Sequence, residues 1–448
     1  MIQKLLSHSS LALFVAVTPL IAQEASESTT FAVSQESGES STYVESTFVE
    51  ASAEPEVSSF FFPGGYGYLP ETISPGTGTY ARPPVDFSLT LQTGYNDNIY
   101  SSSGKEGASP RKGSPTVQGS GGVNLLLNNP RTFVSLGANV GAVYYTEKER
   151  NALSPVGSMT AALAHSFSPR VQLTSRVNAG YYSQPNLSLP NAPTANSGDY
   201  FNLGSLFNLS YRWTPLFTTD TSFGANTQIF RDSQSEDSNY VELFVGESFR
   251  YLFAPRFTGV AEVRFSSFNY NGSNRNSTTE SVMAGFDWQM SSRLTSTFRG
   301  GASFRQFDIA GSEDRVSPYV ESAVGYRYGR GSLLQWTTRY GFEEAHDAFS
   351  SNQTFRTGLM VSQVLTPRIN ASLGLNYAYE RYERLADEFN HDNFTRDQHL
   401  FTGSTRLEFI ATRSLTLFGS YSYTRNISDT EFNEYYRNEV SVGATIHF

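Results

Sequence analysis

Cysteine is absent from this 448-residue sequence, and its absence excludes several kinds of site at once. No disulfide framework, thiolate metal site or cysteine nucleophile is available, and no N-terminal cysteine can carry a lipid. Long apolar runs are also missing. After the N-terminal region, no stretch approaches the roughly 18 consecutive apolar residues of a membrane helix.

Aromatic and small residues are abundant. The chain has 34 Phe, 26 Tyr and 36 Gly, yet its mean hydropathy is negative. This mixture is typical of a surface whose aromatic and polar faces alternate. The net charge of −10 is uneven, because residues 1–80 hold nine Glu against Lys4 and so contribute −8. The rest has no basic field, so we expect no nucleic-acid partner.

The N-terminus has the organisation of a secretory signal peptide. Lys4 gives a positive n-region, Leu11–Val17 an apolar h-region, and Ala22 a cleavage residue, although Leu20 stands where a second small residue is usual. We therefore expect a signal peptide over residues 1–22. An exported chain without a membrane helix is periplasmic, secreted or a β-barrel.

Residues 23–84 form a second compositional region. They are acidic and rich in Ser, Thr and Glu, and later in Gly and Pro. Such a segment buries too little apolar surface to offset the entropy lost on ordering, so we expect it to be disordered and periplasmic.

From Val85 onward, apolar and polar residues alternate. In Val85–Tyr95 the odd positions are largely apolar and the even ones are Asp, Ser, Thr, Gln and Gly. Helical spacing would place the polar residues all around a cylinder, so the pattern predicts strands with one face to lipid and one to water. The same alternation recurs in Val171–Tyr181, Ile369–Tyr377 and Val440–Phe448.

Short turn sequences recur at intervals of 37 to 46 residues. Each interval fits one hairpin plus one longer loop, as at the two ends of an outer-membrane barrel. Eight turns join nine hairpins, which predicts about 18 strands, within a range of 16–18, and an even number returns both termini to the periplasmic side. The turns are Asn129-Pro-Arg131, Ser168-Pro-Arg170, Thr214-Pro-Leu216, Ala254-Pro-Arg256, Ser291-Ser-Arg293, Gly329-Arg-Gly331, Thr366-Pro-Arg368 and Ala411-Thr-Arg413.

The predicted fold is all-β: a transmembrane, antiparallel, up-and-down β-barrel over residues 85–448. Backbone groups in hydrocarbon must all be paired, and pairing every strand requires closure. A soluble β-sandwich or β-helix is the alternative. It would need a second layer to bury its aromatic faces, and it would not explain why short turns alternate with long loops.

The last strand resembles a known assembly signal. Val440, Val442, Ala444 and Ile446 alternate with other residues, and the chain stops on Phe448. This end resembles the C-terminal signal by which the barrel-assembly machinery recognises outer-membrane clients, although Ala444 is smaller than usual. The resemblance implies that machinery as a partner during biogenesis and outer-membrane lipid around the finished barrel.

A second resemblance lies at the exit of the first strand. Thr93-Gly-Tyr-Asn-Asp-Asn-Ile-Tyr100 contains a Gly-Tyr-x-Asp-Asn element that resembles the close of strand one in the β-barrel porin-2 family of bacterial outer-membrane proteins. The resemblance would cover about Val85 to Phe448. It implies the location more than the activity, since the family includes barrels linked to exopolysaccharide export.

Charged residues of the strands fall on the face opposite the aromatic stripe. Charge is costly on a lipid-facing surface, so we expect these residues to line the lumen. The candidates are Arg176, Arg212, Arg250, Arg264, Arg299, Arg305, Arg327, Arg339, Arg356, Arg406, Asp220, Glu242, Glu262, Asp287, Glu321, Glu343, Glu380 and Glu408.

Two uses of these charges remain open. Interleaved rings of both signs, with Arg slightly ahead, would give at most a weak anion preference. Alternatively, Arg and Glu could pair across neighbouring strands to brace the wall, and bracing is compatible with lining a pore. Glu247 breaks the pattern, being in register with apolar Val245 and Phe249. We expect a β-bulge there rather than a subunit interface.

Tyrosines gather near the predicted strand ends. Examples are Tyr144-Tyr145, Tyr181-Tyr182 and Tyr435-Tyr436. A girdle at the membrane interfaces is the expected use, and a platform for stacking sugars is the alternative.

Enzymatic and metal sites find little support. His391-Asp392 and His399 lack a convincing ligand spacing, and no convergent His with Ser or Asp is evident. We therefore expect no enzyme, no catalytic or metal site and no cofactor. Barrels of 16 to 18 strands leave an aqueous channel, so the leading hypothesis is an outer-membrane porin for passive diffusion of small hydrophilic solutes. The alternatives are an exopolysaccharide export component and a structural or adhesive barrel with a closed lumen.

Overall fold

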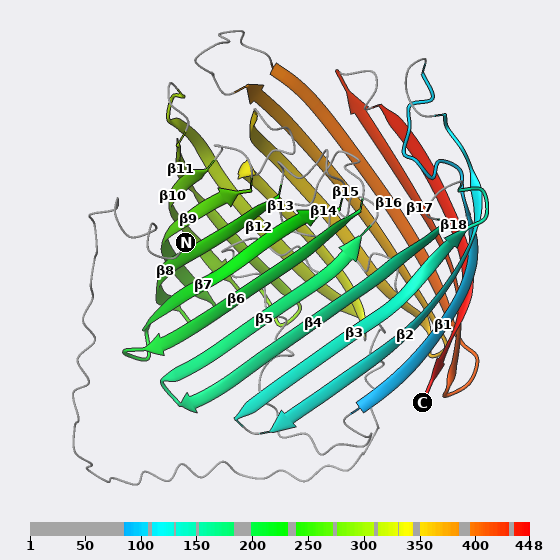
Figure 1. Ribbon diagram of the computed structural model, residues 1–448. Helices are drawn as coiled ribbons and strands as arrows, with labels where there is room; N and C mark the ends of the chain where they lie inside the picture. The colour runs from blue at the N-terminus through cyan, green and yellow to red at the C-terminus, as the bar shows by residue number, and fades with distance from the viewer. Residues whose placement is uncertain are drawn as a thin grey trace, which may run out of the picture. The chain divides into compact units, whose positions relative to one another are not determined.

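Strands form where the alternation predicts them, and together they make a closed antiparallel barrel of 18 strands in the computed structural model (Figure 1). The structure describes residues 85–105, 110–129, 131–148, 152–182, 199–231, 239–271, 276–308, 312–329, 331–343, 350–384, 395–429 and 434–448. The expected signal peptide at 1–22 and the acidic segment at 23–84 lie outside the described residues.

The strands run from 12 residues in β1 to 17 in β14. Among the described residues there is no helix of the length and apolarity needed to cross a membrane. The strands are β1 (Val85–Asn96), β2 (Ser114–Asn129), β3 (Thr132–Tyr145), β4 (Leu153–Ser168), β5 (Val171–Tyr182), β6 (Tyr200–Arg212), β7 (Phe217–Phe230), β8 (Tyr240–Ala254), β9 (Phe257–Tyr270), β10 (Ser277–Trp288), β11 (Leu294–Phe307), β12 (Arg315–Gly329), β13 (Ser332–Glu343), β14 (Ser350–Thr366), β15 (Ile369–Arg384), β16 (Thr395–Ile410), β17 (Leu415–Ser428) and β18 (Tyr435–His447).

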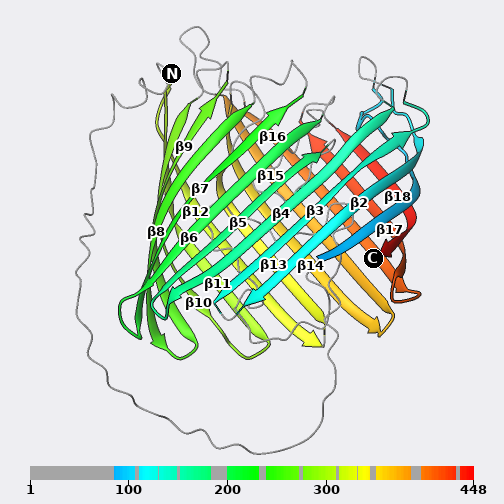
Figure 2. The ribbon, with the colours of Figure 1, turned by 60° about the horizontal axis from the view of Figure 1, so that its bottom comes forward.

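Each strand pairs with the next along the chain, and β1 pairs with β18 to close the sheet. At this seam Leu91 lies opposite Ala444, and the Phe448 N–H donates to the Phe87 carbonyl at 2.9 Å. Figures 1 and 2 show β1 beside β18 and all strands running obliquely around the barrel. The up-and-down topology is the one predicted.

The eight predicted short turns all fall between consecutive strands. Ser and Thr hydroxyls at several of them accept backbone N–H groups two or three residues on, which compensates for the ladder bonds lost where the strand ends. Thr214 Oγ1, for example, accepts the Phe217 N–H at 3.0 Å. We call this end of the barrel the turn end and the opposite one the loop end. Val85 and Phe448 both lie at the turn end.

The outer face of the barrel is apolar and its inner face is polar. On β1, Leu89 and Leu91 point outward and are 54% and 63% exposed, whereas Ser88 and Thr90 point inward and are 8% and 4% exposed. The same alternation of exposed apolar and buried polar side chains runs through β8, where Leu243 is 54% exposed and Glu242 3%. A water-soluble protein buries its apolar side chains instead, so the apolar outer face calls for an explanation.

Candidate functional site

The sequence candidates for the lumen all occupy the inner face of the barrel. Residues paired directly across neighbouring strands point to the same side of a sheet, and the registers place each candidate in line with the buried polar residues. Nine-tenths or more of the side chain is buried for most of the acidic members. Arg212 and Arg327, close to the turn end, are exposed. The candidates lie on β5 (Arg176), β6 (Arg212), β7 (Asp220), β8 (Glu242, Arg250), β9 (Glu262, Arg264), β10 (Asp287), β11 (Arg299, Arg305), β12 (Glu321, Arg327), β13 (Arg339, Glu343), β14 (Arg356), β15 (Glu380) and β16 (Arg406, Glu408).

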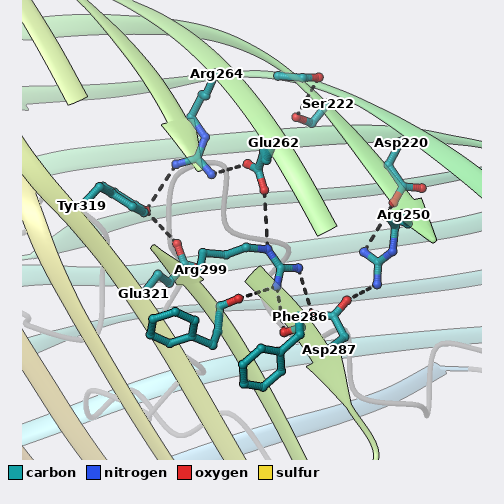
Figure 3. Close-up of polar contacts among 12 residues, drawn as sticks. Asp220, Ser222, Arg250, Glu262, Arg264, Phe286, Asp287, Arg299, Tyr319 and Glu321 are labelled. Atoms are coloured by element: carbon teal, nitrogen blue, oxygen red, sulfur yellow. Dashed lines mark hydrogen bonds and ion pairs between the residues drawn. The ribbon is translucent and has the colours of Figure 1, made fainter. Parts of the chain in front are cut away.

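A first ion-pair network crosses β7 to β12 (Figure 3). Arg250 bridges Asp220 and Asp287, and Asp287 also accepts a hydrogen bond from Arg299 at 2.8 Å. Arg299 continues the network, because its Nε lies 3.8 Å from Glu262 Oε2. Every one of these charges therefore has an oppositely charged neighbour on another strand.

The network reaches β12 through a tyrosine. Arg264 contacts Glu262 at 2.5 Å and donates to the Tyr319 hydroxyl at 3.3 Å. That hydroxyl in turn donates to Glu321 Oε2 at 2.7 Å. Figure 3 shows the side chains converging from separate strands on the enclosed side of the sheet.

A second network crosses β13 to β15. Arg356 Nε donates to Glu343 at 2.7 Å, and its Nη2 lies 3.4 Å from Glu380. Arg339 lies 3.8 Å from the same Glu343, and the Tyr382 hydroxyl donates to Glu380 at 2.5 Å. We call the inner face of β7 to β16, which carries both networks, the charged arc.

The ion pairs of the two networks compensate the buried charges. Buried charges are costly unless they are paired and hydrogen-bonded, and Arg356 and Glu380 are only 4% and 2% exposed. The arginines and carboxylates of the two networks thus brace one another across strands. Their charges largely cancel, which leaves little net field on this side of the enclosed space.

The inner face of β1 to β6 has a different chemistry, and we call it the neutral arc. Within the described part of these strands, its charged members are Asp86 and Arg212 at strand ends and Arg176 in the middle. The remaining inward positions are mostly small or amide residues, among them Ser88, Thr90, Gln92, Gln118, Ser120, Asn124, Asn139, Ser158, Thr160, Thr174, Asn178 and Asn202.

Sequence reasoning missed several inward charges. Arg437 and Glu439 on β18 lie 3.6 Å apart, and His447 Nδ1 lies 3.4 Å from Asp86. Strand parity could have found them, because they alternate with Val440, Val442 and Ile446, whose side chains are 41% to 57% exposed on the outer face.

Aromatic residues occupy both faces near the loop end. Of the adjacent pairs, Tyr144 and Tyr436 point outward and are 47% exposed, whereas Tyr145 and Tyr435 point inward and are 7% and 4% exposed. The outward set suits the expected girdle. The sequence pattern did not distinguish the inward tyrosines from this outward girdle.

Glu247 lies in a regularly paired part of β8. The predicted β-bulge is wrong, because the pairing continues without a shift through Thr221, Glu247 and Val263 on β7, β8 and β9. The register shift on β8 falls instead between Leu252 and Ala254. Glu247 therefore keeps its outward direction among apolar neighbours, and its Oε2 accepts a hydrogen bond from Thr221 Oγ1 at 2.6 Å.

The Gly-Tyr-x-Asp-Asn element at the exit of β1 lies against β18. Asp97 accepts hydrogen bonds from the backbone N–H of Asn438 at 2.7 Å and from its Nδ2 at 2.9 Å. Arg111 Nη2 donates to Asp97 at 2.6 Å, and its guanidinium stacks 3.6 Å above the Tyr436 ring. Partial burial lowers the pKa of Arg111, but the contacts with Tyr436 and Asp97 outweigh this and raise it, so the group stays charged. We call these contacts the seam latch.

The structure describes one of the two histidine candidates, His399. His391 and Asp392 lie outside the described residues. His399 lies on β16, where its Nδ1 is 2.9 Å from the Tyr377 hydroxyl. In the described part of the chain, no group of three or more His, Asp or Glu side chains is placed to hold a metal ion.

Comparisons with known proteins add little detail. No protein-family model and no curated protein matches the chain. Among solved structures, OccAB4 of Acinetobacter baumannii is 11% identical with a TM-score of 0.41, over 82% of this chain and 99% of that one. OpdQ of Pseudomonas aeruginosa is 9% identical with a TM-score of 0.41, over 81% and 97%. The siderophore receptor PirA of Pseudomonas aeruginosa is 10% identical with a TM-score of 0.36, over 83% and 81%. The resemblance to the β-barrel porin-2 family stays a prediction, and the fold stands on the strand pairing itself.

Proposed function

We propose that this protein is an outer-membrane channel through which small hydrophilic solutes diffuse passively. The observation that carries the proposal is the inside-out polarity of a closed barrel. Exposing a side chain such as Leu91 or Phe448, 63% and 72% exposed, to water costs about 25 cal/mol per Å² of apolar surface. In a bilayer these side chains contact hydrocarbon instead of water, so the cost disappears. A closed barrel is the one β architecture whose backbone N–H and C=O groups are all paired in hydrocarbon.

The number of strands supports a channel rather than a solid barrel. Eight-stranded barrels enclose little beyond their own side chains, whereas barrels of 16 to 18 strands leave room for water. This barrel has 18 strands, and its inner face is polar throughout most of its circumference. With the turn end in the periplasm, both Val85 and Phe448 would lie on that side. The outward-facing Val440, Val442, Ala444, Ile446 and Phe448 would be available to the barrel-assembly machinery.

Purified protein in a planar lipid bilayer is expected to give stepwise increases in conductance. Because the charges of the charged arc are paired, we expect weak ion selectivity, with a chloride-to-potassium permeability ratio of about 1 to 3. Reversal potentials in a salt gradient measure this ratio. Folded protein that inserts without conducting at any voltage would contradict the channel and favour a closed lumen.

Replacing Glu247 with leucine is expected to stabilise the barrel in lipid by about 1 kcal/mol, since an outward carboxylate in the middle of a strand lies in hydrocarbon. Urea unfolding in lipid vesicles measures the change. Glu280→Leu is the matched control, because Glu280 also points outward but lies four residues into β10 from the loop end, where a charge costs less. A clear loss of stability in Glu247→Leu alone would instead point to a subunit contact.

A further inference from the structure

We propose that the neutral arc binds neutral saccharides on their way through the barrel, with Thr160 and Asn178 hydrogen-bonding to sugar hydroxyls and Tyr182 stacking on the sugar ring. This inference rests on the proposed channel function and names the class of solute that the channel prefers. The site lies on β4 and β5, toward the loop end.

A row of polar residues, interrupted by two glycines, crosses the neutral arc and continues onto β7 and β8. The registers of successive strand pairs put its members directly opposite one another. Because the row is perpendicular to tilted strands, it climbs the wall from Asp86, the second residue of β1 at the turn end, to Glu242, near the loop end of β8. We call it the amide row, and it consists of Asp86, Asn124, Gly137, Thr160, Asn178, Gly204, Asn226 and Glu242.

Two glycines let the polar groups of this row converge. A Cβ at Gly137 would lie 3.0 Å from Asn124 Oδ1 and 3.2 Å from Thr160 Oγ1. A Cβ at Gly204 would lie 2.7 Å from Asn178 Oδ1 and 3.1 Å from Asn226 Oδ1. Amide and hydroxyl groups from β2, β4, β5 and β7 thus lean over the bare backbone of β3 and β6.

Part of the row has hydrogen-bonding groups without a partner among the described residues. Thr160 points inward and is nonetheless exposed, so its hydroxyl faces the lumen. Asn178 Oδ1 is itself buried and makes no hydrogen bond to any described residue, although the residue as a whole is only half-buried. An unpaired amide oxygen costs free energy, and rotation about χ2, which is soft in asparagine, would offer it to a hydroxyl in the lumen. Asn226 differs, because it donates to Glu242 at 2.7 Å.

An aromatic cluster lies immediately beyond the amide row toward the loop end. Tyr182, Tyr200 and Phe230 are paired across β5, β6 and β7, with ring centroids 5.5 and 5.9 Å apart. Tyr182 folds back over Gly180, so that a Cβ at Gly180 would overlap its ring. The ring therefore covers Gly180, which lies between Tyr182 and Asn178 on the inner face of β5.

Tyr182 is the most accessible member of the cluster. Tyr200 and Phe230 are 1% and 4% exposed, whereas Tyr182 is half-buried. A ring face next to amide and hydroxyl groups matches a sugar, which has apolar C–H faces and a rim of hydroxyls. No net charge is needed for such binding, in keeping with the paired charges across the lumen.

The test measures how strongly maltotriose, a neutral trisaccharide, blocks the ion current through single channels. It compares the wild-type protein with the double variant Thr160→Val/Asn178→Leu. We expect maltotriose to interrupt the wild-type current and the double variant to bind it about tenfold more weakly, as the loss of two hydrogen bonds implies. Conductance without sugar should stay nearly unchanged. Asn376→Leu is the matched control, because Asn376 points inward on β15 and hydrogen-bonds to Thr402 at 3.2 Å.

The outcomes separate the two proposals. Channels that conduct but are not blocked by maltotriose would overturn the saccharide site and leave the channel standing. Equal weakening in Asn376→Leu and in the double variant would also overturn it, because the effect would then belong to the lumen as a whole. Folded wild-type protein that never conducts would overturn the channel itself. The slower gel migration of unfolded barrels after heating confirms that each variant is folded.

Discussion

Replacing Gly94 with valine is expected to prevent closure of the barrel and to reduce the folded fraction at least about tenfold. A Cβ at position 94 would overlap the backbone carbonyl oxygen of Val440 and lie 3.0 Å from the Ser441 Cβ, so β1 and β18 could not keep their distance. Overpacking against a backbone costs about 3 kcal/mol or more. The clash falls on the seam, the one strand pair that forms between the two ends of the sheet, and refolding into lipid vesicles followed by gel mobility without heating measures it.

Gly119→Val on the adjacent strand is the matched control. Gly119 lies on the outer face of β2, directly opposite Leu91 of β1, and nothing lies within 4 Å of a Cβ placed there. The same substitution at this site should fold as the wild type does. Normal assembly of Gly94→Val would show that the seam tolerates a wider spacing and that the seam latch, not the glycine, sets the closure.

Replacing Arg356 with methionine is expected to destabilise the barrel by about 3 to 5 kcal/mol, because it leaves buried carboxylates without their cation. Arg356 is 4% exposed and joins Glu343 on β13 to Glu380 on β15. Urea unfolding in vesicles, followed by the fluorescence of the three tryptophans, gives the change in the free energy of unfolding.

A rescue distinguishes charge from packing in this variant. Arg356→Met combined with Glu343→Gln and Glu380→Gln removes the uncompensated charges, so we expect at least half of the lost stability to return. Arg212→Met is the control for loss of an arginine at an exposed strand end and should change the stability by no more than about 0.5 kcal/mol. If the triple variant is as unstable as Arg356→Met, the arginine acts through packing of its stem.

Several features could be predicted from the sequence because they depend on local periods. Alternation with a period of two, as in Val85–Tyr95, follows from strand geometry, so each strand and each face could be assigned from neighbours in the chain. The turns such as Ser168-Pro-Arg170 and Thr214-Pro-Leu216 are equally local, because a proline there stands next to a hydroxyl residue that accepts a backbone N–H group three residues on. The strand number of 18 and the inward direction of residues such as Arg250 and Glu262 follow from these two signals.

At Glu247 the local sequence pattern gave a wrong prediction. An acidic residue in an apolar register looked like a shift in the strand, yet β8 keeps its pairing with both β7 and β9 through this position. The hydrogen bond from Thr221 accommodates the carboxylate without a bulge. Thr221 is 26 residues away in the chain, and nothing in the sequence around Glu247 indicates it.

What the sequence by itself determined is the barrel, its strands and which residues face inward, because these depend on spacing along one chain. What only the tertiary structure decided is which inward residues meet. The ion pairs of Arg250, Arg299 and Arg356, the amide row of the neutral arc and the contacts of Asp97 with Asn438 all depend on register between strands. Register is set by how every hairpin aligns around a closed sheet, so it cannot be read from any one strand.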